Sequence, residues 1–139
     1  MKNIAASIAR VARELLAEDE FTIITTKPMR FKPEGSTMNA LANARMIADA
    51  GYGFKHGTVH FEDERGGIQS MEVFFQRGDD IAVHTFAGYN LGYSGEGPRG
   101  MVEFGKIFGL GLDPNKIFSP EYRASLQKKA AYDLIQLLG

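Results

Sequence analysis

Three consecutive segments between residues 57 and 86 alternate apolar and polar side chains with a period of two, and this pattern constrains the fold most. They read GTVHFEDE, IQSMEVFFQ and DIAVHTF, and the short glycine-containing sequences RGG and RGD separate them. Such alternation between glycine loops is typical of antiparallel strands joined by hairpins. The sequence therefore predicts an antiparallel β-meander with one face in the core.

The register of this meander follows if the apolar side chains of the three strands share one face. Placing Phe61 opposite Met71, and Val73 opposite Val83, satisfies that condition. Each pairing leaves a three-residue loop, a length that hairpins use. The alternation and the turn lengths therefore agree on one register.

The same register places His60, Glu72 and His84 in one row on the other face of the sheet. Two imidazoles beside a carboxylate can share protons, so the row is a candidate general acid/base site. The outer strands lie roughly 9.6 Å apart, which argues against a metal ion held by all three side chains. The alternative is an ordinary polar sheet face, open to solvent or covered by a subunit, because cross-strand polar pairs stabilise sheets.

Apolar side chains recur at helical spacing before and after the meander. Ser36 or Thr37 can cap the second predicted helix, and Gly51 can end it in the left-handed conformation. The β-branched segment Phe21–Thr26 predicts one further strand. The predicted helices span about Asn3–Ala17, Met38–Ala50, Pro98–Phe108 and Glu121–Leu138. These elements predict a single α+β domain over residues 1–139, an antiparallel meander of about four strands with N-terminal, central and C-terminal helices packed on one face.

Composition excludes several classes of function. The chain of 139 residues has a formal net charge of −1 and no cysteine. Disulfides, thiol catalysis and thiolate metal sites are therefore excluded, and no overall charge attracts a nucleic-acid polymer or an anionic membrane. The first twenty residues lack a continuous apolar stretch, and no later segment approaches membrane-spanning length. We expect a cytoplasmic protein with no cofactor and no membrane partner.

A basic loop follows the first predicted strand. Lys27, Arg30 and Lys32 surround Phe31 within the sequence TTKPMRFKP. A loop with cations and an aromatic ring can bind a phosphate and stack on a base. The alternative is a solvated surface loop without a ligand.

The glycine-rich sequence YNLGYSGEGPRGMVEF, residues 89–104, lies between an apolar strand and an apolar helix. Pro98 suits the first helical position, so residues 95–97 form a lead-in whose amides, together with the helix dipole, make an anion pocket. Arg99 then occupies the first turn, where the dipole disfavours a cation. A bound anion, or the neighbouring Glu96, would offset that conflict.

Tyr89 and Tyr93 supply aromatic faces beside this turn. The sequence matches neither a Walker P-loop nor a dinucleotide-binding fingerprint. The structural alternative is a tight strand-to-helix connection in which the glycines only permit the reversal.

The stretch GYSGEGP, Gly92–Pro98, resembles a G-Y-x-G-x-G-P element that precedes a helix in short phage and mobile-element proteins. It is also similar to the small phage-encoded Thoeris anti-defence sponges, which sequester cyclic ADP-ribose-type and other cyclic nucleotide signals. The resemblance implies a viral protein in the host cytoplasm, a homo-oligomer, and nucleotide binding without turnover. It also implies that Arg99 and the neighbouring glycines contact phosphate.

These observations leave three hypotheses for the function. The first is a binding protein that sequesters a phosphate-containing small molecule such as a cyclic nucleotide. The second is an inhibitor or assembly protein that binds a host protein, and the third is a small enzyme that uses the histidine row. The candidate ligand-binding residues are Tyr89, Tyr93, Gly95, Gly97, Arg99, Gly100, Lys27, Arg30 and Phe31.

Overall fold

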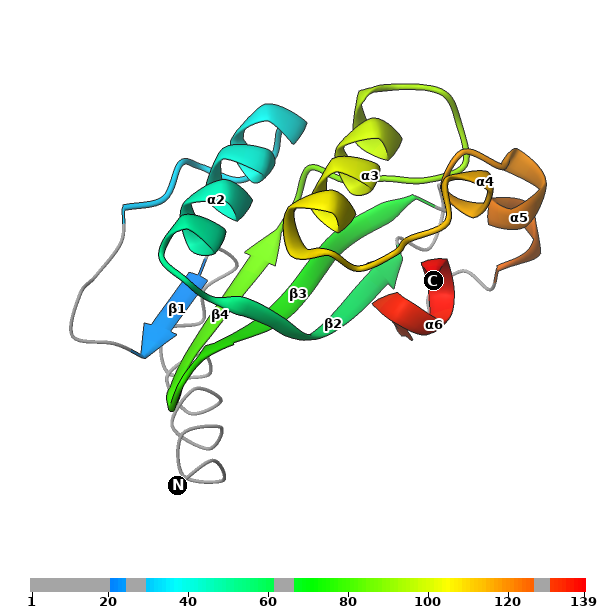
Figure 1. Cartoon of the computed structure of the whole chain (residues 1–139). Coiled ribbons are helices and arrows are strands. Elements are labelled where there is room, and N and C mark those ends of the chain that lie inside the picture. Colours follow the sequence, from blue (N-terminus) through cyan, green and yellow to red (C-terminus); the bar gives the residue numbers. More distant parts are fainter. Residues whose placement is uncertain (1–20, 25–29, 62–66, 127–130) are drawn as a thin grey trace.

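The computed structural model describes residues 21–24, 30–61, 67–126 and 131–139, and within these ranges five strands form one antiparallel sheet (Figure 1). The strand order is β1-β4-β3-β2-β5. The predicted α+β class is confirmed, whereas the predicted helix over residues 3–17 lies outside the described residues. The strands are β1 (Phe21–Ile24), β2 (Gly53–Phe61), β3 (Ile68–Arg77), β4 (Asp80–Phe86) and β5 (Ala131–Asp133). The helices are α2 (Thr37–Asp49), α3 (Glu96–Phe108), α4 (Pro114–Ile117), α5 (Pro120–Ser125) and α6 (Leu134–Leu138).

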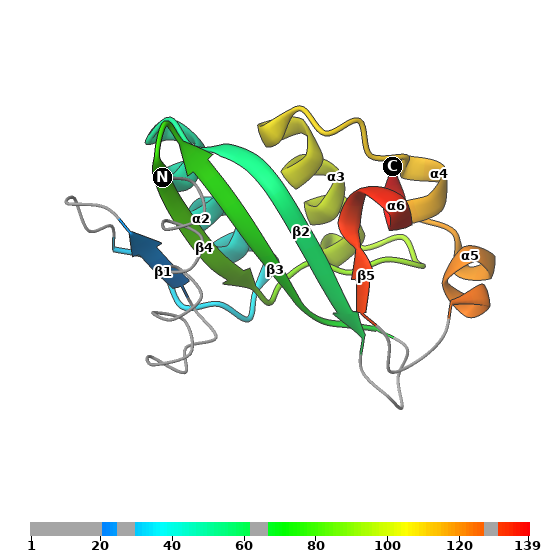
Figure 2. The same cartoon turned by 90° about the horizontal axis from the view of Figure 1, so that it is seen from below.

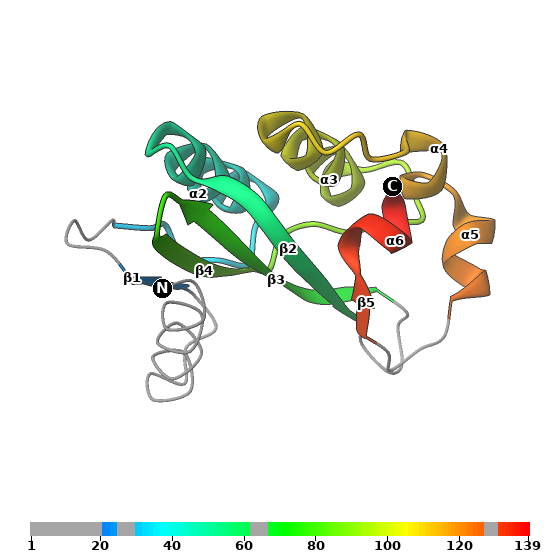
Figure 3. The same cartoon turned by 60° about the horizontal axis from the view of Figure 1, so that its bottom comes forward.

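The helices α2 and α3 lie side by side over one face of the sheet, as Figures 2 and 3 show from two further directions. The main core fills the space between these helices and the sheet. Ile47 from α2, Phe75 from β3 and Phe104 from α3 are fully buried there. The core extends to α6 through Leu134, which is also fully buried. Burial of this apolar surface is the main force that holds the two layers together.

The two ends of α2 are the predicted ones. Ser36 is the N-cap, and its Oγ accepts a hydrogen bond from the Asn39 backbone N–H at 3.1 Å. The helix ends at Asp49 with Ala50 as its C-cap, and Gly51 follows with a φ of 89°. Of the predicted strand over residues 21–26, β1 covers the first four residues, and Thr25 and Thr26 lie outside the described residues.

The pairing of β2 with β3 differs from the prediction by two residues. Val59, and not Phe61, lies opposite Met71, and Phe61 lies opposite Ile68 after an irregularity at the end of β2. A shift of two residues leaves each side chain on its predicted face because the side-chain period is two. Val59 and Met71 are accordingly fully buried.

The pairing of β3 with β4 differs from the prediction by one residue, which reverses the face of every β4 side chain. Arg77 pairs with Asp80, so the hairpin turns over two residues, Gly78 and Asp79, and not over the predicted three. Gly78 has a φ of 60°, and two-residue hairpin loops favour such left-handed conformations. Val83 therefore packs with Phe74 and not in the main core.

The predicted row of His60, Glu72 and His84 is wrong because both registers differ from the predicted ones. His84 lies opposite Val73 on the face covered by the helices, and His60 lies opposite Ser70. Neither histidine is a cross-strand partner of Glu72. The acid/base relay that this row would form does not exist.

The predicted C-terminal helix over Glu121–Leu138 is also wrong. The helix α5 ends at Ser125, and β5 then pairs with β2, with Thr58 opposite Asp133. Asp133 begins α6, because its Oδ2 accepts a hydrogen bond from the Gln136 backbone N–H at 3.1 Å. The leucines at helical spacing belong to two short helices and not to one long helix: Leu126 is the C-cap of α5, and Leu134 and Leu137 are buried residues of α6.

Asp133→Ala is expected to lower the free energy of unfolding by about 1 kcal/mol, the usual cost of losing an N-cap. Its Oδ1 also lies 3.0 Å from His56 Nε2, but that imidazole is 54% exposed, and exposed pairs contribute little. Urea denaturation of Asp133→Ala and His56→Ala separates the two contacts, because His56→Ala should cost less than about 0.5 kcal/mol. Equal losses in the two variants would contradict the capping role.

Within the described ranges, no helix has both the length and the apolar character that crossing a bilayer requires.

Candidate ligand-binding site between two helix N-termini

The helices α2 and α3 begin beside each other at the same end of the sheet (Figure 1). A cleft of about 460 Å³ lies at this end. Ser36 and Thr37 line it from the start of α2, Glu96 and Gly97 from the start of α3, and residues 87–90 from the segment after β4. We call this hollow the N-terminal cleft. Its volume falls in the range of small-molecule sites, about 300–1,000 Å³.

The start of α2 is joined to the segment after β4. Thr37 Oγ1 donates a hydrogen bond to the Gly88 carbonyl at 2.6 Å. Both residues line the N-terminal cleft. This bond therefore fixes two of its walls against each other.

The start of α3 has amides that no side chain caps. The N-cap is Gly95, which is extended (φ −169°) and has no side chain to accept a hydrogen bond. The helix begins at Glu96, so Pro98 is its third residue and not the predicted first. The missing N–H of a proline is still harmless there, because first-turn amides have no partner within the helix. The amides of Glu96 and Gly97, with the helix dipole, are groups that bind anions in other proteins.

Arg99 lies at the predicted position in the first turn of α3, and a local contact offsets part of its conflict with the dipole. Its Nε donates a hydrogen bond to the Gly95 carbonyl at 3.2 Å. The same carbonyl accepts the Arg99 backbone N–H at 3.1 Å. The side chain is exposed, and among the described residues no hydrogen bond or ion pair uses its terminal amino groups. This geometry leaves the guanidinium able to bind a ligand.

The glycines of the lead-in make room for the chain's own side chains. A Cβ added to Gly95 would lie 2.6 Å from Cε2 of Tyr93, whose ring is 39% exposed. A Cβ added to Gly97 would lie 2.8 Å from Asn90 Cβ and 2.9 Å from the Tyr93 hydroxyl. Real Cβ atoms do not approach this closely. Close approach of neighbouring side chains thus accounts for both glycines, a packing reason that differs from the chain reversal offered as the structural alternative. Gly97 and Tyr93 also line the cleft.

A second hollow, of about 590 Å³, adjoins the cleft and runs between α2 and α3. We call it the helix groove. Arg45 from α2 and Arg99 from α3 both line it, together with Met38, whose side chain is 72% exposed. Thr37 and Glu96 line both hollows, so the groove lies directly beside the cleft. Two cationic side chains from neighbouring helices therefore face the same space.

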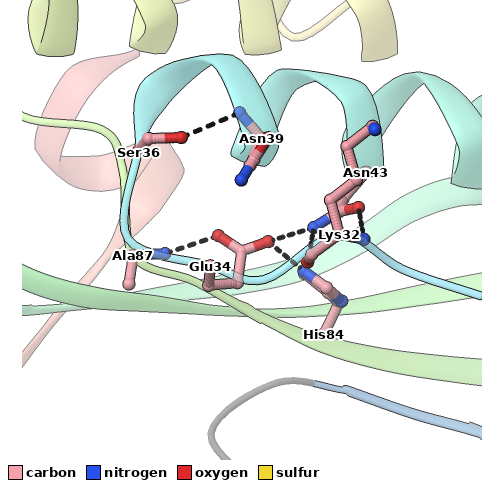
Figure 4. Close-up of polar contacts among 7 residues, drawn as sticks. All are labelled: Lys32, Glu34, Ser36, Asn39, Asn43, His84 and Ala87. Carbon is pink, nitrogen blue, oxygen red and sulfur yellow. Dashed lines mark hydrogen bonds and ion pairs between the residues drawn. The ribbon is translucent and has the colours of Figure 1, made fainter.

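A buried polar network lies next to the cleft (Figure 4). The Glu34 carboxylate is 6% exposed and has three hydrogen-bond partners. Its Oε1 accepts the Ala87 backbone N–H at 2.9 Å. Its Oε2 lies 2.6 Å from Asn43 Nδ2 and 2.6 Å from His84 Nε2. The network joins the loop before α2, the helix itself and the end of β4.

Sequence reasoning missed Glu34 and Asn43. Glu34 stands in a proline- and glycine-containing loop, where an acidic residue is normally solvated. Asn43 is fully buried within α2, and an asparagine at a core-facing helical position is the one signal that could have drawn attention to the network.

Tyr89 does not offer a ring to a ligand. It is 3% exposed, and its ring packs on Phe86 and Phe104 at centroid distances of 5.5 and 5.4 Å. Burial raises the pKa of its hydroxyl far above the usual range, and the Glu34 carboxylate raises it further. The prediction that this ring is a stacking face is wrong because the core encloses it.

The basic loop is not part of the cleft or the groove. Phe31 packs its ring on His84 at a centroid distance of 4.8 Å, so its ring contributes to packing. Arg30 and Lys32 are exposed and line neither hollow. Lys27 lies outside the described residues.

In the part of the chain that the structure describes, no three histidine or acidic side chains gather closely enough to hold a metal ion. Comparison with known protein families, curated proteins and solved structures finds no match.

Proposed function

We propose that this protein binds a small phosphate-containing molecule across the N-terminal cleft and the helix groove, and that it leaves the molecule unchanged. One observation carries the proposal: two helix N-termini and two arginines, Arg45 and Arg99, surround adjoining hollows. Helix N-termini favour negative charge, and guanidinium groups bind phosphate oxygens through charge-assisted hydrogen bonds. Both features support an anionic ligand.

The acidic side chains of the hollows indicate what else the ligand carries. Glu96 lines both hollows, and Glu103 lines the groove. These carboxylates repel a second anionic group but accept hydrogen bonds from amino and hydroxyl groups. This pattern favours a phosphate attached to a sugar or base over inorganic polyphosphate.

The residues that line the two hollows support binding without conversion. The hydroxyls of Ser36 and Thr37 line the cleft, and both are used by the fold: Ser36 Oγ accepts the Asn39 N–H, and Thr37 Oγ1 donates its proton to the Gly88 carbonyl. A nucleophilic hydroxyl must instead give its proton to an adjacent base. The Thr37 proton is directed at a backbone carbonyl, which is not such a base.

The resemblance of Gly92–Pro98 to the anti-defence sponges makes cyclic nucleotides and ADP-ribose derivatives the first ligands to test. A phage-type protein that sequesters such a signal in the host cytoplasm, as a homo-oligomer, is part of the same proposal. Light scattering of the purified chain measures the oligomer. Loss of Thoeris protection in cells that express the chain measures sequestration.

Arg99→Ala is expected to weaken binding of such a ligand at least about tenfold, because it removes a charge-assisted hydrogen bond to phosphate. The measurement is the thermal shift of the wild type and the variant with ADP-ribose and with cyclic nucleotides, followed by mass spectrometry of the ligand.

Arg30→Ala is the matched control, because Arg30 is also exposed but lines neither hollow. It should keep the full shift. An undiminished shift in Arg99→Ala would exclude the proposed contact, and a converted ligand would show that the protein is an enzyme. If no compound shifts the wild type, the binding proposal fails.

A further inference from the structure

The Glu34 side chain connects two walls of the N-terminal cleft, although Glu34 itself does not line the cleft. Its chain neighbours Gly35 and Ser36 line the cleft on the α2 side, and Ala87 and Gly88 line it on the β4 side. Glu34 Oε1 accepts the Ala87 N–H at 2.9 Å, so one carboxylate bridges the two segments.

The partners of Glu34 require an acceptor at both of its oxygens. The Ala87 N–H can only donate to Oε1. The orientation of the Asn43 amide is fixed by Lys32, whose N–H donates to Oδ1 at 2.8 Å and whose carbonyl accepts from Nδ2 at 2.9 Å (Figure 4). Asn43 Nδ2 must therefore donate to Glu34 Oε2 as well, at 2.6 Å.

His84 completes the set with Nε2 at 2.6 Å from Oε2. An ionised carboxylate accepts all three bonds when His84 carries its proton on Nε2. Three donors around a carboxylate that is 6% exposed also offset the cost of removing its charge from water.

We infer that Glu34 is the positioning residue of the N-terminal cleft, and that its carboxylate sets the spacing between the start of α2 and the Ala87–Gly88 backbone. This inference rests on the proposed function, because it concerns the same binding site. Glu34 touches no ligand itself and acts through the backbone of Ser36 and Ala87. The neighbouring hydrogen bond from Thr37 to the Gly88 carbonyl also joins these two segments, but its donor is a residue of α2.

A glutamine at position 34 has nearly the same shape as the glutamate, but only one of its two terminal groups is a hydrogen-bond acceptor. Its NH₂ group must face either the Ala87 N–H or the two donors at the other oxygen, so two donors oppose each other in a buried site. Glu34→Gln is therefore expected to detach one wall of the cleft.

The test measures amide hydrogen exchange by NMR without ligand, and binding of ADP-ribose by calorimetry, on the full chain. In Glu34→Gln, the Ala87 amide should exchange at least about tenfold faster relative to the Ala82 amide of β4 than in the wild type. ADP-ribose should bind at least about tenfold more weakly. Glu121→Gln is the matched control, an exposed glutamate in α5 that should change neither quantity.

The two readouts separate the two possible failures. If Ala87 and Ala82 lose protection by the same factor in Glu34→Gln, or if neither changes, Glu34 does not position the cleft and the inference is overturned. If Ala87 alone loses protection but ADP-ribose does not bind the wild type, the ligand proposed for the cleft is wrong and the bridge itself stands.

Glu34→Asp provides a second variant if Glu34→Gln does not fold. Aspartate keeps both acceptors on a side chain one methylene shorter and cannot reach all three donors at once. A faster Ala87 exchange than in the wild type supports the inference, and wild-type exchange with wild-type affinity overturns it.

Discussion

Gly100→Ala is expected to lower the free energy of unfolding by about 1–3 kcal/mol, the usual cost of overpacking a core. The same change in an ordinary helix interior raises stability by about 1 kcal/mol, because alanine is the better helix former. The sign reverses here because α2 and α3 touch at this position. A Cβ added to Gly100 would overlap Cγ2 of Thr37 and would lie 3.1 Å from Cδ1 of the buried Tyr89.

Thr37→Ser is the designed partner of this variant. Serine lacks the Cγ2 methyl group that would overlap the Cβ of alanine at position 100, but it keeps the hydroxyl that donates to the Gly88 carbonyl. In a double-mutant cycle by urea denaturation, the double variant should recover about 1 kcal/mol or more of the loss. Additive losses in the cycle would show that the two helices do not meet at these residues.

The strands and the first central helix could be predicted because local patterns determine them. Alternation marked β2, β3 and β4, and the Ser36 cap and Gly51 marked the ends of α2. Hairpin register was less accessible, because two-residue and three-residue loops both fit the sequence around Gly78. The difference of one residue in loop length decides whether His84 lies in the core or on the opposite face of the sheet.

The C-terminal segment could not be predicted from its spacing alone. The spacing of Leu126, Leu134 and Leu137 fits one long helix, and it fits equally well two short helices separated by the edge strand β5. Pairing of β5 with Thr58–His60 of β2 is a tertiary contact, and it overrides the local helical preference.

The candidate site was predicted in part. The glycine-rich stretch does place Gly97 and Tyr93 in a cleft and Arg99 in the adjoining groove. The sequence did not reveal that the start of α2 forms the opposite wall, or that Glu34 joins the two. Such contacts connect residues about 50 positions apart, and no local pattern encodes them.

Tyr89→Phe is expected to leave the stability at pH 7 unchanged or to raise it by up to about 1 kcal/mol, because the lost hydroxyl is buried and has no hydrogen-bond partner among the described residues. Tyr122→Phe is the matched control. The Tyr122 hydroxyl donates to the Leu137 carbonyl at 2.5 Å, so its loss should cost about 1 kcal/mol. A similar cost for Tyr89→Phe would mean that its hydroxyl has a partner in solution.

The same variant should also change the stability of the protein in alkali. In the unfolded chain a tyrosine ionises near pH 10, about its unperturbed pKa, whereas burial and Glu34 raise the pKa of Tyr89 in the folded state. Above that pH the unfolded chain binds fewer protons than the folded one, so the wild type loses about 1.4 kcal/mol per pH unit from this group alone. Below it, both states are protonated and the contribution is constant.

The pKa of Tyr122 is also raised, by burial and then by Tyr132, but that effect is common to the wild type and Tyr89→Phe and cancels in their difference. Urea denaturation between pH 8 and 11 should therefore show a shallower alkaline loss in Tyr89→Phe, and parallel curves would contradict the burial of this hydroxyl.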